Sequence, residues 1–365
     1  MEDNIIVLKF DDSKIPEFKE VRGKQYVYFG EDNDYPNYLI KLFNKSAKHN
    51  AIINGKVTYI FGEGFYCKVE DPVADRFIFK VNSANESLND IAKKCAIDIE
   101  IFGGFYLNII PNRLGEISEI YHLDFNRVRA NEDCSQFFYK NDWITNRDKP
   151  KEYPAFNQEK GAGSQIYYFK CYQPNLTYYP IPDWSAGQRA IEIDIEAKNF
   201  HMNNLRKGMV PSLWVNYNNG IPGEEEQRIL VRAMEEQYGG TDNAGQAIIS
   251  FNESKEQSPE IVQIPRNDHD SYYQTLNDDI TRTILSAHRV SSAELFGIAT
   301  AGKLGGGNEI VEHSEYFRKM VIQPYQNEIL PAFSKLVSLK FDKPTTFEVK
   351  PLSLYAFRLN ILYLF

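Results

Sequence analysis

The sequence predicts an α+β protein, because two kinds of pattern alternate along the chain. Segments such as FYLNIIP (105–111) and QIYYFKCY (165–172) have the aliphatic and aromatic composition that favours strands. Residues 88–102 and 272–290 instead carry apolar side chains at helical spacing. With 365 residues, of which 42% are hydrophobic, the chain is long enough for two globular domains.

The first 183 residues are expected to form one α+β domain that begins with a short strand at 4–10. Pro36 favours the start of a helix, where its missing N–H is not needed. Ser46 is expected to cap the next helix. That helix is expected to stop at Gly62, because glycine adopts the left-handed conformation at low cost.

A third helix is predicted over 88–102, with Asn85 as its cap and Gly103 at its end. Strands are then expected in 105–111 and 117–130, around a turn at 112–115. The strand pattern continues in QFFYKNDWI (136–144) and QIYYFKCY (165–172), and the polar residues 146–164 are interpreted as the loop between them. These segments complete the predicted first domain.

The pattern changes after Trp184, where a long helix is predicted over 189–208. A strand is expected in SLWVNYNN (212–219), followed by a helix over 224–238 whose three leading glutamates suit the positive end of the helix dipole. Two further strands are expected in QAIISF (246–251) and EIVQIP (260–265). Together these elements predict a compact αβ insert, 209–265, between two long helices.

The second long helix ends near His288 and Arg289, which are expected to interact favourably with the helix dipole. Five glycines follow within about a dozen residues, and glycine costs a helix roughly 1 kcal/mol each. We therefore expect an irregular, pliable loop before helical periodicity resumes at Ile310 and continues to Leu336. Residues 338–354 are predicted to form two strands around a turn at 342–345.

Several classes of chemistry are not indicated. The four cysteines lie far apart without a CxxC pair, so no zinc site is predicted: Cys67, Cys95, Cys134 and Cys171. Lys303 follows Gly302, but neither serine nor threonine comes next, so the segment is not a nucleotide-binding loop. No catalytic motif is found. We expect no enzymatic activity, no cofactor, no metal, no signal peptide and no membrane span.

The net charge of −9 limits any role with nucleic acid. Affinity for a phosphate backbone comes from cations that neutralise it. We therefore expect either local contact with nucleic acid or its passage without tight binding.

Five segments, taken in order, have the spacing and local character of a known family. They are YIFGEGF (59–65), the block from Ile99 to Ala130, NLRKGMVPSLWV (204–215), GGTDNAGQAIIS (239–250) and the block from Glu294 to Pro324. In this respect the chain resembles bacteriophage portal proteins, which form the ring through which tailed phages package and eject DNA.

The resemblance implies a portal-type fold with named parts. These are a wing domain (1–183, with 338–357 returning to it), a first stem helix (184–208), a clip domain (209–265), a second stem helix (266–292), a tunnel loop (293–309) and a tunnel helix (310–337). Portal proteins generally continue into a helical crown, and this part is expected to be reduced or absent.

The resemblance also implies a function. The chain would be a structural subunit of a ring, usually a dodecamer, at a capsid vertex. Implied partners are further copies of the chain, the large subunit of the terminase motor, a head–tail adaptor, the capsid protein and double-stranded DNA, with no membrane. The protein would be made in the host bacterial cytoplasm and would reside in the virion.

Three sets of residues are candidates for these roles. The tunnel loop would offer Thr300, Gly302, Lys303, Gly305, Gly306, Gly307 and Asn308 to the DNA, with Lys303 as a local contact. The stem would line the channel with Asp268, Asp270, Asp278 and Asp279, whose charges would repel phosphates. The clip would dock the motor and then the adaptor through Trp214, Tyr217, Glu224, Glu225 and Tyr238.

Two other interpretations remain open from the sequence. A different structural protein of the phage head or neck, such as an adaptor, would also lack catalytic motifs. A metal-dependent nucleic-acid enzyme would use some of the carboxylates to bind magnesium, but no obvious acidic cluster supports it.

Overall fold

The computed structural model of the chain describes residues 16, 18–21, 23–67, 72–145, 148–157, 163–207, 213–217, 220–238, 247–251, 254, 269–298 and 307–352. The strands expected at 4–10 and 260–265 lie outside these ranges. Helices and small sheets are both present, as the α+β prediction requires. The chain divides into two compact units, with Glu192–Ile280 forming unit 2 and the rest forming unit 1.

Local sequence signals set the ends of the first two helices. α1 (Tyr35–Lys45) has Pro36 in its first turn, as predicted. Ser46 caps α2 (Ala47–Phe61) by accepting a hydrogen bond from a backbone N–H of its first turn. The helix ends at Gly62, whose φ of 60° lies in the region that favours glycine. These predictions are confirmed.

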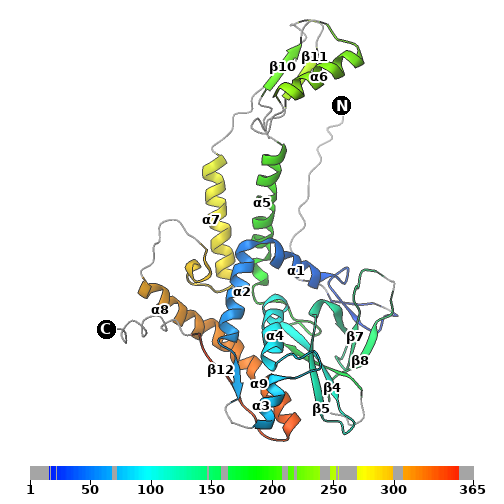
Figure 1. The fold of residues 1–365 in the computed structure, drawn as a ribbon, viewed down its shortest axis with the longest axis vertical. Helices are drawn as coiled ribbons and strands as arrows, with labels where there is room; N and C mark the ends of the chain where they lie inside the picture. The colour runs from blue at the N-terminus through cyan, green and yellow to red at the C-terminus, as the bar shows by residue number, and fades with distance from the viewer. Residues whose placement is uncertain are drawn as a thin grey trace. The chain divides into compact units, whose positions relative to one another are not determined.

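The helix α4 (Leu88–Phe102) has the predicted range but a different cap. Ser87 and Asp90 exchange hydrogen bonds in a capping box. Asn85, the expected cap, has a φ of 61° and lies in the preceding turn. A short helix that the sequence did not indicate, α3 (Pro72–Phe79), comes before it. α2 packs against α4, which in turn packs against the strands β4 and β5 (Figure 1).

A three-stranded antiparallel sheet lies beneath α4. β4 (Gly104–Pro111) is its central strand, between β5 (Ile117–Leu123) and β9 (Gln165–Lys170). The strand expected over 117–130 is interrupted by a 3-10 turn, η1 (Phe125–Arg127). This turn directs the chain into a second sheet.

The second sheet consists of β6 (Val128–Ala130), β7 (Gln136–Tyr139) and β8 (Lys151–Pro154). The prediction of a loop over 146–164 is wrong at β8. This strand pairs on one side only and exposes polar side chains, so its composition resembles that of a loop.

The buried hydroxyl of Tyr179 joins the second sheet to a hairpin of β1 (Phe18–Glu20) and β2 (Val27–Phe29). It accepts a hydrogen bond from the Ala130 N–H at 2.9 Å and donates one to the Val27 carbonyl at 2.6 Å. Its ring is stacked on Phe29 with centroids 4.4 Å apart. Side chains far apart in the sequence therefore form one aromatic core.

The C-terminal part of unit 1 is a long helical segment that returns to the first helices. α8 (Gly307–Phe317) is followed by five residues of π-helix, η5 (Arg318–Ile322), and by α9 (Gln323–Phe341). The strand β12 (Phe347–Val349) then pairs antiparallel with β3 (Phe65–Cys67). This strand agrees with the prediction.

The prediction of a strand before the turn at 342–345 is wrong, because residues 338–341 form the last turn of α9. Leu336 and Val337 are buried, and the helix continues until Asp342 adopts a left-handed conformation with a φ of 51°. Tertiary packing of the preceding turns therefore outweighs the strand-like composition of SLKF.

Two long helices belong partly to each unit. They are α5 (Gln188–Lys207), which follows the 3-10 turn η2 (Ser185–Gly187), and α7 (His269–Ala287). Unit 2 also contains α6 (Glu224–Tyr238) and a parallel pair of strands, β10 (Leu213–Tyr217) and β11 (Ala247–Phe251).

Gly187 and Ala287 bring α5 and α7 close together within unit 1. A Cβ atom added at Gly187 would lie 2.5 Å from the Ala287 Cβ. Small side chains at this point allow the two backbones to approach closely. The helices are thus joined where they enter unit 1.

The glycine at position 55 of α2 makes a similar close contact with Phe296, in the 3-10 turn η4 (Ala293–Phe296). A Cβ atom at Gly55 would lie 2.0 Å from the ring of Phe296. In an unhindered helix, alanine would be favoured over glycine by about 1 kcal/mol.

We therefore expect Gly55→Ala to destabilise the protein by about 1–3 kcal/mol, because the Phe296 ring must move. In a Phe296→Ala background the same substitution should instead be neutral or stabilising. The measurement is the free energy of unfolding in urea for the four proteins of this cycle. An equal effect of Gly55→Ala in both backgrounds would contradict the packing described here.

Candidate functional site

The described structure contains only part of the predicted tunnel loop. Gly307 and Asn308 are the first two residues of α8, so helical structure begins three residues earlier than predicted. The other five loop candidates lie outside the described residues: Thr300, Gly302, Lys303, Gly305 and Gly306.

Both ends of the predicted loop are anchored to α2. On the N-terminal side, Phe296 packs on Gly55 and against Phe317 of α8, with ring centroids 5.4 Å apart. On the C-terminal side, the hydroxyls of Tyr59 and Ser314 are hydrogen-bonded at 2.7 Å. The described residues that precede and follow 299–306 therefore both contact one helix.

The candidate channel residues lie on or before α7. Asp278 and Asp279 are exposed there, and Asp270 lies in the first turn of the helix. Asp268 lies outside the described residues.

The candidate docking residues belong to unit 2. Glu224 and Glu225 are exposed in the first turn of α6, as expected for acidic groups at a helix N-terminus. The backbone positions of the aromatic candidates are described: Trp214 and Tyr217 lie in β10, and Tyr238 ends α6.

A buried ion pair that sequence reasoning did not identify lies near the point where α5 and α7 enter unit 1. The Nζ of Lys56 on α2 lies 2.5 Å from Oε2 of Glu100 on α4, and both side chains are completely buried. Burial raises the pKa of Glu100 to about 7, although the charge of Lys56 opposes this shift. The same Lys56 Nζ lies 3.5 Å from Oδ1 of Asp183.

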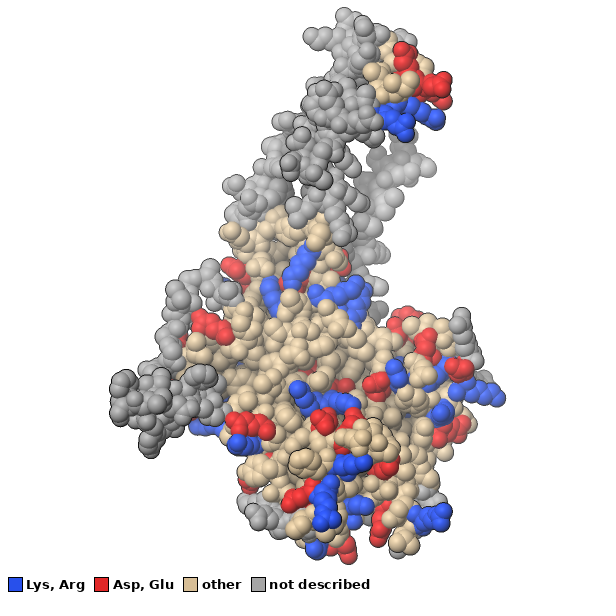
Figure 2. Space-filling model, viewed as in Figure 1, with Lys and Arg blue, Asp and Glu red and all other residues tan. Residues whose placement is uncertain are grey.

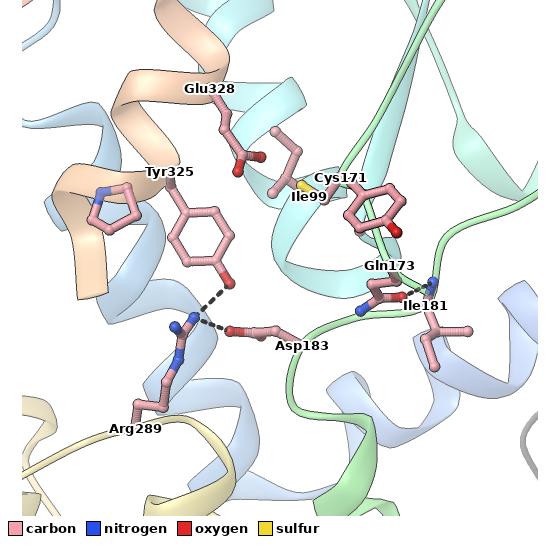
Figure 3. Close-up of a pocket in the computed structure, with 11 residues that line it drawn as sticks. Ile99, Cys171, Gln173, Ile181, Asp183, Arg289, Tyr325 and Glu328 are labelled. Atoms are coloured by element: carbon pink, nitrogen blue, oxygen red, sulfur yellow. Dashed lines mark hydrogen bonds and ion pairs between the residues drawn. The ribbon is translucent and has the colours of Figure 1, made fainter. Parts of the chain in front are cut away.

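Asp183 connects this pair to the surface. Burial alone would raise its pKa, but Lys56, Tyr325 and Arg289 together hold the pKa below its ordinary value. Arg289 forms an ion pair with Asp183 and donates a hydrogen bond to the Tyr325 hydroxyl at 3.3 Å (Figure 3). Asp183, Arg289 and Tyr325 line a cavity of about 170 Å³, together with Cys171 and Glu328.

Two buried histidines lie beside the ion pair. Nδ1 of His49 is 2.9 Å from Nε2 of His288, and the ring of Trp184 packs against both. Burial, followed by the charge of Lys56, holds the pKa of His288 well below its ordinary value. His288 is therefore neutral, and the expectation that it acts as a cation at the end of α7 is wrong.

The cluster joins five segments of unit 1. Its members are Lys56 on α2, Glu100 on α4, Asp183 before α5, Arg289 after α7 and Tyr325 on α9. Trp184 adds a hydrogen bond of 2.6 Å from its Nε1 to the Glu100 carbonyl. Because the charges are paired, we interpret the cluster as a structural junction.

The described residues contain no group of three or more histidine, cysteine or acidic side chains arranged to hold a metal ion. None of the described helices combines the length and the apolar character that a membrane span requires.

Comparison with protein families decides the classification. A family model described as "Phage portal protein" matches residues 70–357. The chain belongs to the phage portal protein family. No curated protein matches the portal chain in sequence.

Solved structures share the portal fold at low sequence identity. The neck of a native gene transfer agent particle, computed with C12 symmetry, contains a chain that is 15% identical with a TM-score of 0.59; the match covers 90% of the present chain and 88% of the other. An HK97-family portal protein from Corynebacterium diphtheriae is 10% identical with a TM-score of 0.50, over 89% and 96% of the two chains. The neck of the empty particle, computed with C6 symmetry, gives 16% identity and a TM-score of 0.58, over 90% and 86%.

The ion pair predicts how the portal chain responds to substitution. We expect Lys56→Met to destabilise it by about 3–5 kcal/mol, because Glu100 would remain buried without its nearest cation. The double variant Lys56→Met/Glu100→Leu should lose clearly less stability than the two single variants added together. Urea unfolding measures all three.

Lys94→Met is the matched control, since it breaks a partly exposed ion pair with Glu86. It should change the free energy of unfolding by less than about 1 kcal/mol. If Lys56→Met were as mild as this control, the buried pair would have no role in holding the junction.

Proposed function

We propose that the chain is the structural subunit of a portal ring, a dodecamer, through which double-stranded DNA enters and leaves a capsid. Membership of the portal family is the observation that carries this proposal. The fold similarity to chains from particle necks computed with C12 and C6 symmetry supports it. The protein would be made in the bacterial host cytoplasm and reside in the virion beside the capsid protein.

The channel would work by repelling DNA weakly along its length. Rotational symmetry turns each residue that faces the bore into a ring of identical charges. Asp278 and Asp279 are exposed on α7 and carry the charge that this role requires. Rings of cations would instead hold the phosphates, because each neutralised phosphate adds affinity.

The glycine-rich segment before α8 would be the part that adapts to DNA. Glycine allows backbone conformations that other residues rarely adopt. Copies of the loop could therefore differ in shape where the ring and the DNA helix do not share a symmetry. Lys303 would supply a local phosphate contact.

The insert of 209–265 would be the docking surface for the large terminase subunit and then for the head–tail adaptor. The aromatic residues Trp214, Tyr217 and Tyr238 are of the kinds enriched at interfaces. The exposed glutamates of α6 would guide a partner of opposite charge. The insert would thus serve two partners in succession.

Electron microscopy tests the ring directly. Purified protein should give annular particles with a central hole, and their mass should be a whole multiple of the 42.2 kDa chain. A protein that remained a single copy at all concentrations and salt conditions would refute the proposal. Solid or filamentous particles would favour another structural role.

The loop is tested by replacing Gly305, Gly306 and Gly307 with alanine. We expect rings to assemble normally but DNA packaging to fall by at least about tenfold, because the loop becomes stiffer. Packaging is measured as nuclease-protected DNA per particle. A single replacement at Gly163, which lies outside both the loop and the insert and has open space for a side chain, serves as the control. Normal packaging by the triple variant would remove the loop from the mechanism.

Deletion of 209–265 tests the insert. The two long helices would be reconnected by a short glycine–serine linker, and recruitment of the terminase large subunit would be measured by co-purification. We expect recruitment to be lost while unit 1 retains its unfolding transition. Undiminished recruitment would show that the motor docks elsewhere.

A further inference from the structure

A groove lies beside the helices that follow the glycine-rich segment. It is lined by parts of α2, α8, η5, α9 and β12, all of which belong to unit 1. Its volume of about 550 Å³ is in the range of sites that hold a ligand. The groove is therefore large enough to take several side chains.

Hydrogen bonds to α2 hold two of the helical walls in place. The hydroxyls of Tyr59 on α2 and Ser314 on α8 are hydrogen-bonded at 2.7 Å. Gln326 on α9 donates a hydrogen bond from its Nε2 to the Ile60 carbonyl at 3.0 Å. Contacts within unit 1 thus shape the groove, and less ordering is needed when a segment binds there.

The chain itself is directed into this groove. The backbone N–H of Lys350 donates to the Gly64 carbonyl at 3.1 Å, and the Glu63 N–H donates to the Lys350 carbonyl at 2.7 Å. Leu352 then forms part of the lining. Residues 353–365 follow it in the sequence and therefore start at the groove of their own copy, where their effective concentration is high.

Residues 353–365 have the composition of a segment that is stabilised by burial, because most of their side chains are apolar. Arg358 is the single charged residue among them. The groove offers an apolar surface at Val311 and Val349 and a carboxylate at Glu315. The apolar and aromatic residues of the segment are Leu354, Tyr355, Ala356, Phe357, Leu359, Ile361, Leu362, Tyr363, Leu364 and Phe365.

The charges around the groove are compatible with an apolar segment. Arg318 and Lys319 line it, and their aliphatic stems can cover apolar side chains while the charged groups stay in water. On the visible face of unit 1, the described basic and acidic side chains are interspersed and form no broad field of one sign (Figure 2). Apolar contact therefore decides where the segment binds.

We propose that residues 353–365 bind in this groove of their own chain and fasten α8 and η5 to β12. α8 is the helix that follows the glycine-rich segment, so the bound residues hold the base of that segment in place. The inference does not depend on the proposed ring, because all of its contacts lie within one copy.

Hydrogen exchange followed by mass spectrometry tests the contact. The full chain is compared with a shortened chain that ends at Leu352. We expect the amides of 311–326 to exchange at least about fivefold faster in the shortened chain, because α8 and η5 then open more often. The second sheet, 128–139, does not line the groove and serves as the internal control, with equal exchange in both chains. Equal exchange over 311–326 would overturn the inference.

A peptide of residues 353–365, made soluble by a neutral polyethylene glycol chain, tests the groove as the binding site. Added to the shortened chain, it should restore the slow exchange of 311–326. Val311→Asp in the shortened chain, or Leu354→Asp/Phe357→Asp in the peptide, should weaken binding at least about tenfold, because a carboxylate would then be buried among apolar groups. Leu114→Asp is the matched control, since Leu114 is 70% exposed and does not line the groove. Binding that is insensitive to these groove and peptide substitutions would refute the site.

A mixing experiment distinguishes binding within one copy from binding between copies. The full chain is mixed with an excess of shortened chain that carries a heavy nitrogen isotope, so that the two are separated by mass. Slow exchange in the full chain should persist, because its own residues 353–365 occupy its groove. Faster exchange in the full chain, with protection appearing in the shortened chain, would place the segment on a neighbouring copy and overturn the inference. Each readout concerns a single chain, so the proposed ring can fail without affecting it.

Discussion

The buried ion pair between Lys56 and Glu100 is the interaction on which the arrangement of unit 1 depends. A charge without water is tolerated only beside an opposite charge, so α2 and α4 are fixed relative to each other at this point. Asp183 and Arg289 extend the constraint to the segments that begin α5 and end α7. Apolar contacts alone would permit more sliding between these elements, because they have no preferred direction.

Close backbone contacts complement the charges. Gly187 against Ala287 sets the separation of the two long helices, and Gly55 against Phe296 seats the residues that lead into the glycine-rich segment. A ring subunit must present the same surface in every copy, and directional and steric constraints of this kind limit the variation between copies. The described residues on both sides of the glycine-rich segment are thereby attached to a firm support.

Most helices could be predicted because their signals are local. Pro36, Ser46, Gly62 and Gly103 act on their own turns, so their effects can be read from a short stretch of sequence. β8 could not be predicted, because its polar side chains resemble those of a loop. Its pairing with β7, which makes it an edge strand, is not visible in the local sequence.

The candidate site was predictable to a smaller extent. Family resemblance indicated the function. Asp278, Asp279, Glu224 and Glu225 are exposed, and the roles expected for them stay predictions. The Lys56 cluster could not be predicted from the sequence, because its members come from five segments and none of them belongs to a recognisable motif. Likewise, His288 looked like a surface cation at a helix end, and only tertiary packing against Trp184 makes it a neutral core residue.

The π-helical segment η5 has a consequence for the spacing of residues along the C-terminal helices. The buried side chains of α8, such as Ser314 and Phe317, and those of α9, such as Ile329 and Phe333, differ in angular phase by about 100° on an uninterrupted α-helix. One surplus residue in the wider turn cancels that difference, and both stripes point into the same core. Deleting one residue here would therefore give a regular α-helix with both stripes still facing the core, whereas adding one residue would turn the apolar side of α8 away from it by about 100°.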